Sequence, residues 1–380
     1  MKKIMFLQIK GKSFGGIWLV NKTLADKFTS LGYDVQVCSI RDNHPGNYEE
    51  TNFKQHTIND VLEWKIVHKR DVLLSVKKHC FFKTLKKYIN DKKKLNNDYK
   101  KMKQYILKEK PDYIIASHYQ TLPGIPKQYL NKTIHVQHSA FKLVKQDKYN
   151  YRTLKKYNKK LFSLVWLSKS TYEFAQNEGF IKNMYIYNPV RIKCEKKADV
   201  VKNKQLVVLS RFSFEKRIDL MVEMVNDVFK DNKFKDWKFC LYGQGELSEK
   251  TLNIINKNNQ IFNMGVANDA KKVLLESSCS LNTSIYEGFP LSIIESLTCG
   301  VPSVIFDYGE SAKELIIDGK TGFVVEQNKQ NEFEEKLKTI MENSDLLERF
   351  SKEAKKEAKK YNLDNIISIW LETLKKIDNR

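Results

Sequence analysis

The sequence predicts an α/β protein of two facing Rossmann-like domains, each built on a doubly wound parallel sheet. Three observations carry this prediction. Short apolar runs alternate with helix-length segments along the chain, a polar stretch at residues 191–204 interrupts the alternation once, and 380 residues suit two domains better than one. We therefore expect an N-terminal domain at residues 1–190 and a C-terminal domain at residues 191–361.

The first domain opens with a strand pattern at residues 3–9, a glycine-containing loop and a helical pattern at 17–31 that Gly32 closes. A strand pattern at 35–40 follows, which completes a β-α-β unit. Later strands are predicted at 113–116, 134–136, 164–167 and 184–187 in this domain, and at 205–210, 238–242, 260–264, 280–284, 303–306 and 322–325 in the second.

The net charge of +22 is unevenly distributed. Residues 1–190 hold 36 Lys and Arg against 15 Asp and Glu, whereas residues 191–380 hold 31 against 30. This asymmetry indicates an anionic partner for the first domain. Residues 75–110 alone hold 13 basic against three acidic residues and predict a basic amphipathic helix pair, which would either be a solvated face or contact a membrane or an acidic acceptor.

A chemically suggestive motif follows the predicted strand at 280–284. Glu287 and Gly288 precede Phe289, Pro290 and Leu291, where a helix is expected to begin, and Glu295 lies one turn further along it. Glycine lets the backbone approach a ligand, proline suits the start of a helix, and the free N–H groups there attract anions. The motif therefore predicts a diphosphate site that needs no metal.

These residues resemble glycosyltransferase family 4 of the GT-B fold, which carries two glutamates separated by seven residues in this setting. The resemblance continues through residues 300–325 and covers most of the C-terminal half. It implies that Glu287 lies near the donor sugar and that Glu295 hydrogen-bonds the nucleotide ribose. It also implies that the terminal helix, within residues 362–380, packs back on the first domain.

Cations are predicted where the first strand of the second domain ends, in the segment 210–217. Arg211 and Lys216 could neutralise the charge of a departing nucleoside diphosphate, a task that a divalent ion performs in other transferases. The resemblance supports both positions.

Glycines in three loops are further candidates for binding the substrate. Gly15 and Gly16 end the loop 11–16, which lacks the order of a Walker or dinucleotide loop; the resemblance implies that they face the donor phosphates. Gly243 follows the strand at 238–242, and Gly265 with Val266 follows the strand at 260–264. The resemblance places these three beside the nucleobase, although either loop could be a plain connection.

Two histidines follow strands of the first domain and are expected to point into the cleft. The resemblance places His138 near the reacting sugar and His118 on the acceptor side. His135 alternates to the opposite face of its strand and is predicted to be a packing residue.

The resemblance thus implies a retaining glycosyltransferase that uses no metal or cofactor. We expect it to move a hexose or N-acetylhexosamine from UDP-glucose or UDP-GlcNAc to an anionic acceptor, such as teichoic acid, a lipid-linked precursor or an acidic polysaccharide. Six unpaired cysteines and the lack of a long apolar span favour a cytoplasmic protein that can contact the inner face of the membrane.

Two alternatives are weaker. A nucleic-acid-binding protein would use the basic first half, but the sequence holds no zinc spacing or RNP-type motif, and its neutral half would have no role. A GT-B phosphorylase or epimerase lacks support because no lysine-centred pyridoxal motif is apparent.

Overall fold

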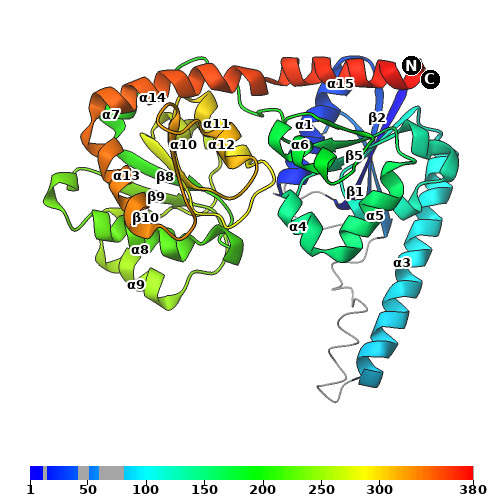
Figure 1. Ribbon diagram of the computed structural model, residues 1–380, viewed down its shortest axis with the longest axis horizontal. Coiled ribbons are helices and arrows are strands. Elements are labelled where there is room, and N and C mark those ends of the chain that lie inside the picture. Colours follow the sequence, from blue (N-terminus) through cyan, green and yellow to red (C-terminus); the bar gives the residue numbers. More distant parts are fainter. Residues whose placement is uncertain (12–14, 42–50, 60–80, 380) are drawn as a thin grey trace.

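The computed structural model describes residues 1–11, 15–41, 51–59 and 81–379. It contains two α/β domains side by side, and the C-terminal helix lies across the first domain, so that the two chain ends are neighbours (Figure 1). Lys2 pairs there with Asp378, whose carboxylate also accepts a 2.7 Å hydrogen bond from the Tyr113 hydroxyl.

The first domain holds a seven-stranded sheet in the order β3-β2-β1-β4-β5-β6-β7, with all neighbouring strands parallel. Its strands are β1 (Lys3–Lys10), β2 (Asp34–Arg41), β3 (Lys54–Asn59), β4 (Tyr113–Ala116), β5 (Thr133–Gln137), β6 (Ser163–Trp166) and β7 (Asn183–Tyr185). Its helices are α1 (Gly16–Ser30), α3 (Phe81–Glu109), η2 (Tyr119–Gly124), η3 (Lys127–Lys132), α4 (Phe141–Gln146), α5 (Lys148–Asn158) and α6 (Lys169–Asn177).

The second domain holds a six-stranded parallel sheet in the order β10-β9-β8-β11-β12-β13. Its strands are β8 (Gln205–Leu209), β9 (Lys238–Tyr242), β10 (Ile261–Asn263), β11 (Cys279–Asn282), β12 (Ser303–Phe306) and β13 (Gly322–Val325). Its helices are α7 (Val200–Asn203), η4 (Phe214–Lys216), α8 (Ile218–Val228), η5 (Asn232–Phe234), α9 (Glu249–Lys257), α10 (Ala270–Leu275), α11 (Leu291–Thr298), α12 (Ala312–Leu315), α13 (Gln330–Glu342) and α14 (Ser344–Glu357), after which η6 (Ala358–Tyr361) and α15 (Leu363–Asp378) return to the first domain.

The predicted fold class is confirmed, and two local predictions need correction. Strand β3 was not expected because this edge strand exposes Lys54 and Gln55 and buries only Ile58, so it has no apolar run. The described part of segment 75–110 is the single long helix α3 rather than a helix pair. Residues 75–80 of that segment lie outside the described part of the chain.

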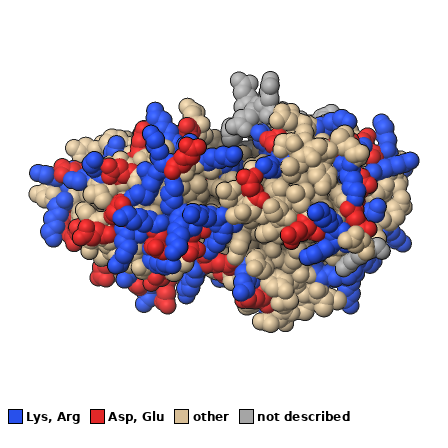
Figure 2. All heavy atoms as spheres, turned by 90° about the horizontal axis from the view of Figure 1, so that it is seen from above, with Lys and Arg blue, Asp and Glu red and all other residues tan. Residues whose placement is uncertain are grey.

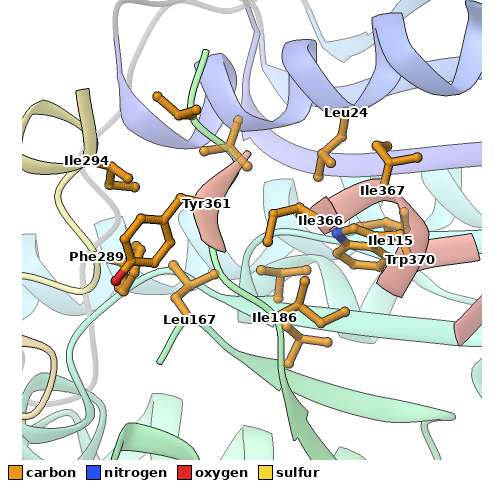
Figure 3. Packing of buried hydrophobic residues seen from close by; sticks show 14 of the residues in the cluster. Leu24, Ile115, Leu167, Ile186, Phe289, Ile294, Tyr361, Ile366, Ile367 and Trp370 are labelled. Carbon is orange, nitrogen blue, oxygen red and sulfur yellow. The ribbon is translucent and has the colours of Figure 1, made fainter. Parts of the chain in front are cut away.

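One apolar cluster joins the two domains to α15. It contains Leu24 and Ile115 of the first domain, Phe289 and Ile294 of the second, and Trp370 of α15 (Figure 3). The opposite face of the first sheet and the interior of the second domain form separate clusters. The helix α15 is therefore part of the core that positions the second domain against the first.

The second domain's near-neutral charge is also visible at its surface. Figure 2 shows Lys and Arg interspersed with Asp and Glu over this half of the molecule, on the face drawn there. Such mixed surfaces favour solubility over attraction of a polyanion.

The replacement Trp370→Ala should lower the free energy of unfolding by about 3–5 kcal/mol, because it opens a cavity where the indole is 2% exposed. Denaturant titration measures the change. The control Glu372→Ala, at an exposed position of α15, should stay within about 0.5 kcal/mol of the parent. Equal losses for both variants would show that the joint cluster does not depend on the indole.

Candidate active site

A cleft of about 460 Å³ lies between the two domains. Each wall uses the carboxyl ends of parallel strands, where doubly wound sheets bind ligands. His138 follows β5 on the first wall, while Arg211 follows β8 and Gly243 follows β9 on the second. The cleft thus brings together residues that are far apart in the sequence.

Lys216 and Glu287 form an ion pair inside the cleft, with side chains 16% and 12% exposed. Lys216 ends η4, and Glu287 lies on the loop after β11. The Ser284 hydroxyl donates a 2.8 Å hydrogen bond to Oε1 of Glu287, the same oxygen that Lys216 contacts. Asn282 Nδ2 lies 3.5 Å from this oxygen as well, so three donors hold the carboxylate at Oε1.

Arg211 contributes a second cation to the cleft, and its side chain is 64% exposed. Its Nη2 lies 3.2 Å from Oε1 of Glu215, four residues away. An exposed pair of this kind stabilises the fold little, so the guanidinium can exchange Glu215 for an anionic ligand.

Glu295 is almost fully buried on α11 and is paired with Arg191, a contact that was not expected from the sequence. Nε and Nη2 of Arg191 lie 3.0 Å and 2.8 Å from the same oxygen, Oε1. Burial raises the pKa of Glu295, and the Arg191 guanidinium opposes that rise. Both residues line the cleft, so the polar stretch that begins at residue 191 also supplies a cation to the site.

His138 brings a neutral ring to the first wall. Burial lowers the pKa of His138 to about 3, and its buried Nε2 has no hydrogen-bond partner among the described residues. Buried polar atoms without partners are uncommon in native structures, and a ligand is one thing that satisfies them.

The backbone beside His138 touches the second domain at Gly288. A Cβ at position 288 would overlap the carbonyl oxygen of His138, so only glycine allows this approach. The Gly288 carbonyl oxygen accepts a 2.8 Å hydrogen bond from Ser311, and the Phe289 carbonyl oxygen accepts one of 3.3 Å from Asn188. The loop from Glu287 to Pro290 is therefore held from both sides.

Most predicted site residues line the cleft. These are Gly16, His138, Arg211, Lys216, Gly243, Val266, Glu287, Gly288, Phe289, Pro290, Leu291 and Glu295. Gly15 caps α1 next to Gly16, and the Gly265 carbonyl oxygen accepts a 2.7 Å hydrogen bond from the Gly243 amide. Residues 12–14 of the predicted glycine loop lie outside the described residues.

His118 does not line this cleft. Its Nδ1 accepts a 3.2 Å hydrogen bond from the Gln120 amide and so caps η2, and its ring stacks on Tyr119. These contacts hold the ring against the start of η2, and the place of His118 on the acceptor side stays a prediction. His135 is fully buried, and its Nε2 lies 3.2 Å from Oε1 of Gln137. This environment agrees with the predicted packing role.

The described ranges contain no group of three or more His, Cys, Asp or Glu side chains placed to hold a metal ion. They also contain no helix with the length and apolarity that crossing a bilayer requires.

Residues 191–357 match the family described as "Glycosyl transferases group 1". The chain is 32% identical over 168 residues to poly(ribitol-phosphate) alpha-N-acetylglucosaminyltransferase of Staphylococcus aureus, covering 43% of this chain and 34% of that protein. It is 30% identical over 167 residues to poly(glycerol-phosphate) alpha-glucosyltransferase of Bacillus subtilis, covering 43% and 24%. The chain thus matches about a third or less of these relatives' length.

The fold likeness extends over the whole chain. A mutant of TarM from S. aureus, solved in complex with fondaparinux, alpha-GlcNAc-glycerol and UDP, aligns with a TM-score of 0.73 and 18% identity over 98% of this chain and 100% of that one. The chain therefore has the two-domain GT-B fold, and residues 191–357 carry its sequence similarity to the group 1 glycosyl transferases.

Proposed function

We propose that this chain is a retaining, metal-independent glycosyltransferase that transfers a hexose or N-acetylhexosamine from a UDP-sugar to an anionic acceptor. One observation carries the proposal. Arg211 and the Lys216–Glu287 pair of the second domain face the cleft that His138 of the first domain also lines. A site with cations on one wall and an unpartnered nitrogen of a neutral ring on the other suits a sugar that leaves a diphosphate.

The donor nucleotide would occupy the second wall. Both Arg191 contacts reach Oε1 of Glu295, so Oε2 is the oxygen that would accept from a ribose hydroxyl. The first amides of α11 would donate to the diphosphate, and the loops at Gly243 and Val266 would enclose the base. The similarity to N-acetylglucosaminyl- and glucosyltransferases and to a UDP-bound structure supports a UDP-hexose or UDP-N-acetylhexosamine.

The reaction would proceed by front-face attack, as in family 4, and would retain the anomeric configuration. Arg211 and Lys216 would stabilise the diphosphate as the bond to the sugar breaks, and the leaving phosphate would accept the acceptor's proton. Glu287 and the His138 ring would position the sugar. The alpha linkages named for both relatives fit retention of an alpha-linked donor.

The acceptor would be a polyol-phosphate chain, a lipid-linked precursor or an acidic polysaccharide. The excess of positive charge in residues 1–190 supports an anionic molecule, and both relatives are named for polyol-phosphate substrates. A cytoplasmic location and contact with the inner face of the membrane remain predictions.

The replacement Arg211→Ala should lower kcat by about 10²–10³-fold, because the departing diphosphate loses a preorganised cation. Transfer from UDP-GlcNAc and UDP-glucose to poly(glycerol phosphate) measures it, with EDTA in a parallel reaction. The control Lys202→Ala removes an equally charged, 85% exposed side chain of the same domain and should leave the rate unchanged. Near-normal turnover by Arg211→Ala, or complete loss of transfer in EDTA, would contradict stabilisation of the diphosphate by Arg211 without a metal.

The replacement His138→Gln should reduce kcat/KM by about 10–10²-fold and leave the shape of the pH profile unchanged from about pH 5 to about pH 8. Burial keeps the pKa of His138 near 3, so falling pH does not protonate the ring in this range. The ring therefore acts as a neutral hydrogen-bonding group. A limb of the wild-type profile that disappears in the variant would instead assign an acid-base role to His138.

A further inference from the structure

A second hollow, of about 750 Å³, lies in the first domain away from the cleft. Its walls are α3, η2 and α5, and the helices α3 and α5 are neighbours in Figure 1. The helix η2 follows β4, and α4 and α5 follow β5 after His138. The hollow is therefore built on connections that leave the carboxyl edge of the sheet, the same edge that supplies the first wall of the cleft.

Four cations line this hollow, two from each long helix. Lys100 and Lys103 come from α3, and Arg152 and Lys156 come from α5. Within the described part of the chain, no carboxylate oxygen lies within 4.0 Å of any of the four, although many other cations of the protein have such a partner. Four exposed cations around one hollow, without carboxylate partners, give it a positive potential that attracts an anion.

Three tyrosines also line the hollow. Tyr99, Tyr149 and Tyr157 line it, and the buried hydroxyl of Tyr99 has no hydrogen-bond partner in the structure's described residues. Burial raises the pKa of Tyr99, and the nearby Tyr149 hydroxyl adds to the rise, so this hydroxyl stays a neutral donor. An unsatisfied buried hydroxyl costs free energy unless a ligand binds it.

The composition of the walls narrows the class of ligand. Lys and Arg side chains offer donors only, and the tyrosine hydroxyls can donate as well, so phosphate oxygens suit them. Tyrosine rings also pack against the C–H groups of a sugar or polyol. The described residues that line the hollow include no Leu, Ile, Val, Phe or Trp, so it lacks the side chains that would insert into a bilayer.

We propose that this hollow binds a phosphodiester of the acceptor chain, one or more units away from the unit that enters the cleft. The inference rests on the proposed transferase function and specifies its acceptor as a polyol-phosphate or phosphoglycan chain. Lys103 and Arg152 contact the phosphate from opposite walls, and the Tyr99 hydroxyl donates to one of its oxygens.

Binding of fluorescently labelled oligo(glycerol phosphate) to the full chain tests the proposal. The double variant Lys103→Gln, Arg152→Gln should raise Kd about tenfold, because two phosphate contacts are lost. The control Lys159→Gln, Lys160→Gln removes the same charge at the end of α5, outside the hollow, and should change Kd less than about twofold. Equal weakening in both double variants would overturn the proposal in favour of unspecific attraction.

The variant Tyr99→Phe separates binding from folding. A hydroxyl without a protein partner stabilises no contact, so its removal should not lower the unfolding midpoint, yet it should weaken oligo(glycerol phosphate) binding about threefold. Unchanged affinity in this variant, or an affinity loss that parallels a lower midpoint, would contradict a ligand-binding hydroxyl.

Further arms distinguish the sources of phosphate and the two proposals. The double variant at Lys103 and Arg152 should bind phosphatidylglycerol vesicles and a single-stranded oligonucleotide as tightly as the parent does. If the double variant instead loses binding to the vesicles or to the oligonucleotide and still binds oligo(glycerol phosphate) normally, the assignment is overturned. All variants should bind UDP normally.

The two proposals can fail separately. If the protein does not bind the oligomer but still transfers sugar to a neutral acceptor, only the proposed phosphate site in the hollow is refuted. If it binds the oligomer but transfers no sugar, the proposed transferase function is refuted.

Discussion

The cleft depends on an aromatic contact among Tyr187, Phe289 and Tyr361. Their ring centroids lie 5.2–5.5 Å apart, and each ring comes from a different segment: the end of the first domain, the loop before α11 and the crossing η6. The Val190 amide donates a 2.9 Å hydrogen bond to the carbonyl oxygen of Tyr361. The segment that leaves the first domain and the segment that returns to it therefore lie side by side. Packing between domains thus sets where the loop that carries Glu287 lies.

Much of the fold could be predicted because buried parallel strands are continuous apolar runs, as at Tyr113–Ala116 and Ser303–Phe306. Strand β3 lacked this signal because Ile58 is its only apolar residue. The positions of Glu287 and Arg211 were also predictable, since a strand end in an open sheet fixes which side chains reach the cleft. For these two residues, the place directly after a strand in the sequence is also the place at the cleft in the structure.

The remaining site features depend on contacts between distant segments, which local patterns do not encode. Arg191 pairs with Glu295 across 104 residues. Gly288 meets the His138 carbonyl only because the domains are closely packed. The orientation of His118 depended on a cap formed two residues later, which a strand-end argument ignores. The converging cations of α3 and α5 form a site only when the two helices are neighbours.

The charges that the described residues bring to the cleft are held in pairs. Lys216 is bound to Glu287, Arg191 to Glu295 and Arg211 to Glu215. Paired charges cost less to bury than isolated ones, so these charges remain compatible with a stable fold. In the proposed function, a diphosphate would replace the 23% exposed Glu215 at the 64% exposed Arg211, whereas the deeply buried Glu295 would stay with Arg191. The exposed pair is therefore the one that can exchange with substrate, and the buried pair is the one that keeps α11 in place.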